Sequence, residues 1–202
     1  MNKECLKWIM PSMKTRSVES SSFRCEKAEE QADIAADMIQ RGVLPTREDI
    51  TKYVNEFFSN IGMENVTPKE EKTKYIYRDI WKKYKPKDMA EKDDQKGMVE
   101  KDDIVWIKFT KNGVVGVIGT SCDVFLGFPN CYGKYSTSDK IVYHVWNKKG
   151  KDDSWSWDTK NVLIFPLCNI PDGLNRSDTE SGIGNYLISK GVPILDFYSH
   201  NY

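Results

Sequence analysis

Four short segments decide the fold: DIVWIKF at residues 103–109, GVVGVIG at 113–119, KIVYHVW at 140–146 and WSWDTKNVLIFPL at 155–167. In each of them β-branched and aromatic residues alternate with other residues, a period-two pattern typical of a strand with one buried face. Together the segments contain four of the six tryptophans and one of the two histidines. We therefore expect a sheet here, and a ligand-binding or catalytic face on it.

The residues before these segments have helical periodicity. The first expected helix starts at residue 26 and places four apolar residues on one stripe: Ile34, Ala35, Met38 and Ile39. The second lies between an N-cap at Thr46 and a terminating Gly62. A third is expected at residues 68–84, because Pro68 is tolerated in a first helical turn.

Helices followed by strands predict an α+β protein, with an N-terminal helical region and a C-terminal antiparallel β-sheet or small β-barrel. A late helix is expected at about 177–190, between a turn-rich segment and a terminating glycine. Residues 192–202 predict a final strand. The expected organisation is a mobile leader at 1–25, a helical region at 26–87, a charged linker at 88–102 and a β-rich domain at 103–202.

Bulk composition excludes several classes of protein. Thirty basic and thirty acidic residues cancel, so no global field draws the chain to nucleic acid or to a membrane surface. No apolar run reaches 18 residues, so no membrane span is expected. The five cysteines form no CxxC pair, which favours reduced thiols in the cytoplasm and no metal or other cofactor. A disulfide between Cys122 and Cys131 in an oxidising compartment is the alternative.

The strongest local charge lies at residues 68–87, where eight lysines or arginines stand against three acids with aromatic residues between them. Basic groups neutralise phosphates and aromatic rings stack on exposed bases. The residues expected to hold a nucleic-acid backbone are Lys74, Arg78, Lys82, Lys83 and Lys85. In the alternative interpretation the aromatics pack inward and the lysines solvate the outer face of the helix.

Aromatic residues of the expected sheet are the second candidate site. A pocket for a flat base would be lined by Trp106, Trp146, Trp155 and Trp157. The alternative is that these rings simply fill the core.

A metal-independent nuclease is the third candidate, because it needs a general base, a general acid and a cation. The residues of suitable type are His144, His200, Tyr143, Lys140 and Arg176. An acid-x-lysine pattern, typical of metal-dependent nucleases, occurs at Asp158–Lys160. The same pattern occurs twice elsewhere in the chain, so it is weak evidence for such a nuclease.

From sequence we expect an intracellular protein that binds nucleic acid, either RNA or DNA. A basic aromatic helix would contact the backbone and a tryptophan-rich sheet would receive a base. A small nuclease or toxin-like effector using His144 and His200 is the first alternative. A module that binds a protein partner without chemistry is the second.

Overall fold

The computed structural model describes residues 21–64, 66–71, 104–120, 137–167, 170–174 and 176–196. Its helices and strands follow in this order: α2 (Ser21–Gln40), α3 (Arg47–Ile61), β1 (Lys69–Glu71), β2 (Ile104–Thr110), β3 (Val115–Thr120), α5 (Thr137–Lys148), the 3₁₀ helix η4 (Asp153–Trp155), β4 (Trp157–Pro166), α6 (Arg176–Ser189) and β5 (Ile194–Asp196). Among these residues no helix is both long and apolar enough to cross a bilayer.

The protein belongs to the α+β class, as the sequence predicts. Its five described strands form one open, mixed sheet in the order β1-β4-β2-β3-β5. Neighbouring strands are antiparallel except β5, which runs parallel to β3. The expectation of a purely antiparallel sheet is therefore wrong in this one pairing. The small-barrel alternative is wrong as well, because the sheet does not close.

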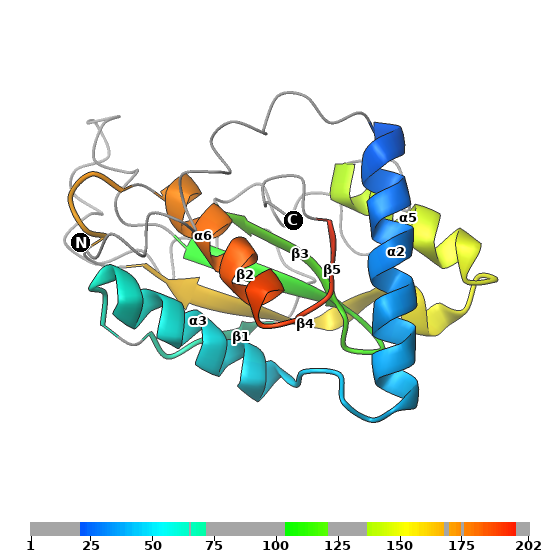
Figure 1. The fold of residues 1–202 in the computed structure, drawn as a ribbon, viewed down its shortest axis with the longest axis horizontal. Coiled ribbons are helices and arrows are strands. Elements are labelled where there is room, and N and C mark those ends of the chain that lie inside the picture. The colour runs from blue at the N-terminus through cyan, green and yellow to red at the C-terminus, as the bar shows by residue number, and fades with distance from the viewer. Residues whose placement is uncertain are drawn as a thin grey trace.

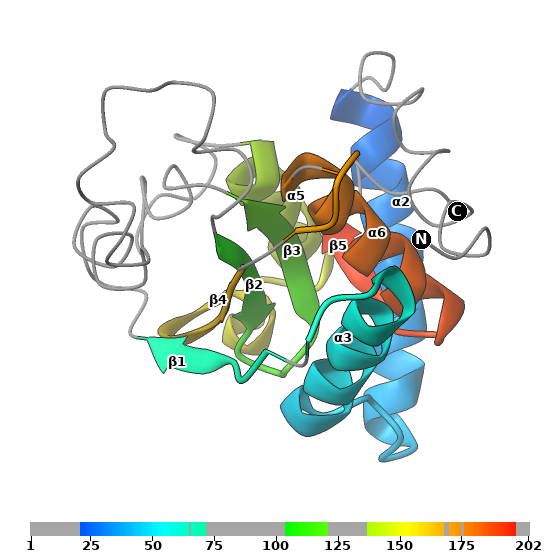
Figure 2. The ribbon, with the colours of Figure 1, turned by 90° about the vertical axis from the view of Figure 1, so that its left-hand side faces the viewer.

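Helices cover both faces of the sheet, as Figures 1 and 2 show. Alternate residues of β2 divide between two cores. Val105 and Ile107 pack with α3 and α6 in one core, which we call the α3/α6 core. Trp106 packs with α2 and α5 in the other, the α2/α5 core. In Figure 1, α2 and α5 lie together on the right and α3 and α6 lie to their left.

Helix α3 confirms the prediction made for it. Thr46 accepts a hydrogen bond from the Asp49 backbone N–H, and the Asp49 carboxylate accepts from the Thr46 backbone in return. Such a capping box satisfies two amide groups that the first helical turn cannot satisfy itself. At the other end Gly62 has a φ of 83°, a left-handed conformation that glycine adopts without strain. The late helix predicted at about 177–190 is confirmed as α6, and β5 lies within the final strand predicted at 192–202, of which residues 197–202 lie outside the described part.

The segment at residues 140–146 is helical, so its prediction as a strand is wrong. It belongs to α5, and its apolar residues Ile141, Val142 and Val145 all face the α2/α5 core. A helix places these three positions on one face, whereas a strand would point Val142 away from Ile141 and Val145. Asp139 in the first turn and Lys148 in the last turn complement the helix dipole and favour the helix.

Two other local predictions are corrected. Residues 69–71 form strand β1 and pair with β4, so they do not begin a helix. The buried stripe of α2 consists of alanines at 28, 32 and 35, whereas Ile34 and Ile39 are exposed. Small side chains let α2 approach α5 and β5 closely, which bulkier residues at these positions would prevent.

Candidate functional site

Helix α5 brings together four residues that the sequence singled out: Lys140, Tyr143, His144 and Trp146. Because its apolar residues face the core, its polar residues form an exposed stripe. We call this stripe the α5 face; it consists of Lys140, Tyr143, Asn147 and Lys148 on the helix and Lys151 just beyond its end. Lys140, Tyr143 and Asn147 are three and four residues apart, which places them on one side of the helix, and Lys148 follows Asn147 directly.

An aromatic pair lies on this helix. The rings of Tyr143 and Trp146 have centroids 5.5 Å apart and are tilted by 35°. Tyr143 is 36% exposed, and Trp146 is half-buried. The ammonium of Lys151 stands 5.9 Å from the Trp146 ring centroid. The helix thus presents an aromatic surface with a cation beside it.

The lysines around this pair differ in how they are neutralised. Lys148 lies 3.4 Å from Glu29, and Lys149 lies 2.6 Å from Asp33, both acids being on α2. Lys140 and Lys151 form no ion pair with any residue in the described ranges. Their charges are therefore available to an external anion.

His144 is paired with Glu29 across the α2–α5 contact. The distance from its Nε2 to the Glu29 Oε1 is 2.6 Å, and the imidazole is 30% exposed. This hydrogen bond, with a further contribution from Lys148, holds the pKa of the Glu29 carboxyl below its usual value. A carboxylate that orients an imidazole is the arrangement used to prepare a general base.

The tryptophans at 106, 155 and 157 are buried, with exposed fractions of 7%, 6% and 4%. A methyl group at Gly119 would meet Trp106 at 2.1 Å, and one at Gly116 would meet Trp157 at 2.2 Å. The indole rings therefore lie directly on the backbone of β3. They fill the α2/α5 core, and only Trp146 of the four tryptophans is partly exposed.

A buried charged cluster joins this core to α2, α5 and β5. Lys108, on the central part of β2, is 3% exposed, and its ammonium stands 4.0 Å from the Trp157 ring centroid. Burial lowers the pKa of Lys108 to about 7, although Asp139 and Asp196 oppose the shift. Asp139 accepts a 2.9 Å hydrogen bond from the Trp157 indole.

Asp196 connects three elements at the edge of this cluster. It accepts hydrogen bonds from Arg24 of α2, at 2.5 Å, and from the Ser138 hydroxyl of α5. Sequence reasoning missed the cluster, although it contained one signal. Lys108 stands two residues after Trp106 in an alternating strand and therefore has to face the same core.

The acid-x-lysine pattern is part of a structural ion pair. Asp158 lies 2.6 Å from Arg47, whose guanidinium also contacts Glu70 at 3.1 Å. Arg47 thereby links α3 to β4 and β1. Within the described ranges, no three His, Cys, Asp or Glu side chains come together closely enough to hold a metal ion.

Several sequence candidates fall outside the described residues. These are Lys74, Arg78, Lys82, Lys83, Lys85 and His200, together with the linker at 88–102 and the cysteines at 122 and 131. Arg176 begins α6, and its side chain also lies outside the described part.

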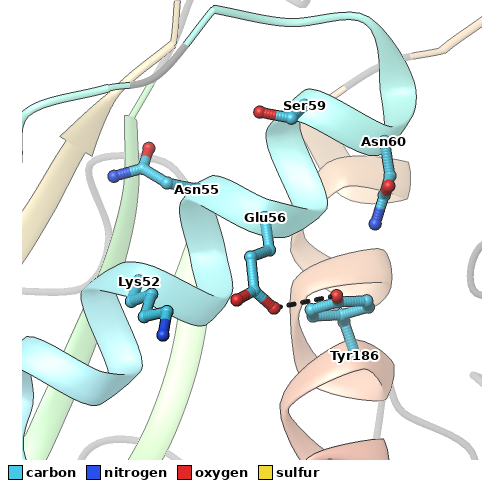
Figure 3. A pocket seen from close by; sticks show the side chains of 6 residues that line it. All are labelled: Lys52, Asn55, Glu56, Ser59, Asn60 and Tyr186. Atoms are coloured by element: carbon cyan, nitrogen blue, oxygen red, sulfur yellow. Dashed lines mark hydrogen bonds between the residues drawn. The ribbon is translucent and has the colours of Figure 1, made fainter.

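An open depression lies between α3 and α6 (Figure 3). Helix α5 packs against the other face of the sheet. It has a volume of about 550 Å³ and is lined by Lys52, Asn55, Glu56, Ser59, Asn60 and Tyr186. The Glu56 Oε2 accepts hydrogen bonds from the Lys190 ammonium at 2.8 Å and from the Tyr186 hydroxyl at 3.1 Å. No sequence motif indicated this site, because its residues come from two distant helices.

Comparisons with protein-family models, curated protein sequences and solved structures found no match.

Proposed function

We propose that the protein binds nucleic acid through the α5 face. The observation that carries the proposal is the pair of unneutralised cations, Lys140 and Lys151, on either side of the Tyr143–Trp146 rings. Lysines neutralise phosphates, and an exposed aromatic ring offers a stacking surface to an unpaired base.

The dimensions of the α5 face support the same proposal. The helical part of the α5 face runs from Lys140 to Lys148, which corresponds to about 12 Å along the helix axis. That length covers several consecutive phosphates of one strand, which are spaced at about 3.4 Å along a duplex. Asn147 lies between the two lysines and carries an amide that can pair with a base edge.

The buried tryptophans change one part of the hypothesis drawn from sequence. We assign the stacking role to Tyr143 and Trp146, because the other sheet tryptophans are covered by α2 and α5. The basic segment at residues 72–87 stays in the proposal as a second source of phosphate contacts; it lies outside the described residues.

Replacing Lys140 and Lys151 together by glutamine is expected to weaken binding to a fluorescein-labelled oligonucleotide roughly tenfold at physiological salt. The reason is the loss of two phosphate contacts, so the dependence of log K on log salt also becomes shallower by about 1 to 2. Fluorescence anisotropy with single- and double-stranded RNA and DNA, at several salt concentrations, measures both quantities.

The matched control replaces Lys52 and Lys160 by glutamine, two exposed lysines on other elements. This variant should bind like the unmodified protein. Binding that is absent, or insensitive to salt, or equally weakened in the control would refute the proposal.

The Glu29–His144 pair favours a second candidate function, that of a metal-independent nuclease. If His144 is the general base, His144→Gln should slow cleavage of labelled RNA by at least about 100-fold while leaving EDTA without effect. Gel analysis of the cleavage products measures the rate. Lys160→Gln serves as the control. An unmodified protein that leaves RNA and plasmid DNA intact, or a His144→Gln variant with full activity, rules this candidate out.

A further inference from the structure

We infer that the α5 face takes a single strand with unpaired bases and not a duplex. The inference rests on the proposed function and names the class of nucleic acid that the site selects. Four features carry it: the side of α5 on which the Tyr143–Trp146 pair lies, the helix that flanks α5, the arrangement of the cations and the backbone at Lys151.

The aromatic pair lies on the side of α5 that faces away from α2. His144 and Lys148 both contact Glu29, so their side of α5 is the one that packs against α2. At about 100° per residue, Tyr143 and Trp146 point roughly 150° around the helix axis from these two residues. Only a base that is not already paired and stacked inside a duplex can lie on their rings. The aromatic pair therefore contributes to the binding of single strands alone.

Helix α2 keeps α5 out of the groove of a duplex. The major groove of B-DNA is about 12 Å wide and admits one helix, whose diameter with side chains is about 10–12 Å. Helix α2 packs against α5 (Figure 1), and the axes of packed helices lie about 8–10 Å apart. A groove that took α5 would therefore have to take α2 as well, and it has no room for both. The major groove of an A-form RNA duplex is narrower still.

The available cations belong to one helix and its end, which suits one phosphate backbone. Lys140 and Lys151 form no ion pair with any described residue. On the neighbouring helix, Lys27 and Arg41 each pair with a carboxylate of α2, at 2.6 and 2.9 Å. The second backbone of a duplex that lay across α2 would meet these neutralised pairs and gain little from them.

The backbone at Lys151 indicates that the position of this side chain serves binding. Among the described residues it is the one non-glycine with a positive φ, 62°, a conformation that costs an L-residue free energy. Its N–H donates to the Trp146 carbonyl at 2.9 Å, and its ammonium stands 5.9 Å from the Trp146 ring centroid. A base and its phosphate are joined through one sugar, so a base on this ring can place its phosphate beside Lys151. Backbone strain of this kind concentrates at functional sites.

The test compares a fluorescein-labelled strand of about 12 nucleotides with the duplex that it forms with its complement, as DNA and as RNA. Anisotropy titrations use the full chain. At about 150 mM salt we expect the single strand to bind at least about tenfold more tightly than the duplex. Binding to neither form refutes the proposed function and this inference with it. Equal affinity, or tighter binding of the duplex, overturns this inference alone and leaves the proposed function standing.

A variant of the aromatic pair tests the cause of the selection. Tyr143→Leu should weaken binding of the single strand at least about fivefold and change duplex binding less than about twofold. Tyr143→Phe keeps the ring and should bind both forms like the unmodified protein. The matched control is Tyr53→Leu, which removes a half-buried tyrosine of α3 on the other face of the sheet and should change neither affinity. A Tyr143→Leu variant that binds both forms as before, or loses both equally, overturns the inference.

Discussion

Gly119→Ala is expected to lower the free energy of unfolding by about 3 kcal/mol, the upper end of the usual cost of overpacking a core. The added Cβ would lie 2.1 Å from the Trp106 Cζ2, far inside van der Waals contact. The obstacle is the rigid ring of a tryptophan that is 7% exposed, so neither side can move away cheaply. Urea denaturation followed by tryptophan fluorescence measures the change.

The steric origin of this effect can be separated from a backbone effect. Gly42 has a φ of 68°, and a Cβ there would meet nothing within 4 Å, so Gly42→Ala should cost only about 1 kcal/mol of conformational strain. In a Trp106→Phe background, which removes the larger ring, Gly119→Ala should cost less than about 1 kcal/mol. An unchanged cost in that background would contradict the explanation.

The free energy of unfolding of the unmodified protein is expected to rise between about pH 7 and pH 10. Lys108→Met is expected to abolish this rise. In the folded chain the pKa of Lys108 is about 7, because burial penalises its charge. The unfolded value is about 10.4, so between these two values the unfolded chain holds one more proton. The free energy of unfolding must then rise with pH by up to about 1.4 kcal/mol per unit. Below pH 7 both states are protonated and this contribution is constant.

The measurement is urea denaturation of both proteins at pH 7, 8 and 9. The unmodified protein should gain about 2 kcal/mol relative to Lys108→Met over these two units, whereas other titrating groups cancel in the difference. Lys160→Met removes an exposed lysine, so its free energy of unfolding should change with pH as that of the unmodified protein does. If the free energy of unfolding of Lys108→Met changes with pH as that of the unmodified protein does, Lys108 keeps its proton in the core throughout this range.

The parts of the fold that the sequence predicted correctly are those with a local signal. Thr46 and Gly62 mark the two ends of α3, and the alternating segments at 103–109 and 113–119 contain most of β2 and β3. The error in α5 has a physical reason. The short run at residues 140–146 is rich in residues that favour strands, but Ile141, Val142 and Val145 share a face only in a helix, where they pack in the α2/α5 core.

The candidate sites were less predictable, because each depends on contacts between distant elements. Tyr143 and Trp146 were selected as residues of a strand, where they would point to opposite faces; a helix brings their rings together. The pairing of Glu29 with His144 links α2 to α5 across 115 positions. The depression at Glu56 and Tyr186 likewise joins positions 130 apart. Spacing within the sequence contains no trace of such pairs.

The parallel pairing of β5 with β3 has a consequence for the order in which the chain folds. Val115 pairs with Ile194 across about 80 residues, and Arg24 meets Asp196 across 172. Contacts of such long range incur the largest loop-closure entropy and are slow to form. During synthesis, α2 therefore emerges from the ribosome long before its carboxylate partner has been made. The first turn of α2 cannot form its ion pair until β5 is made, so we expect α2 to dock among the last events of folding.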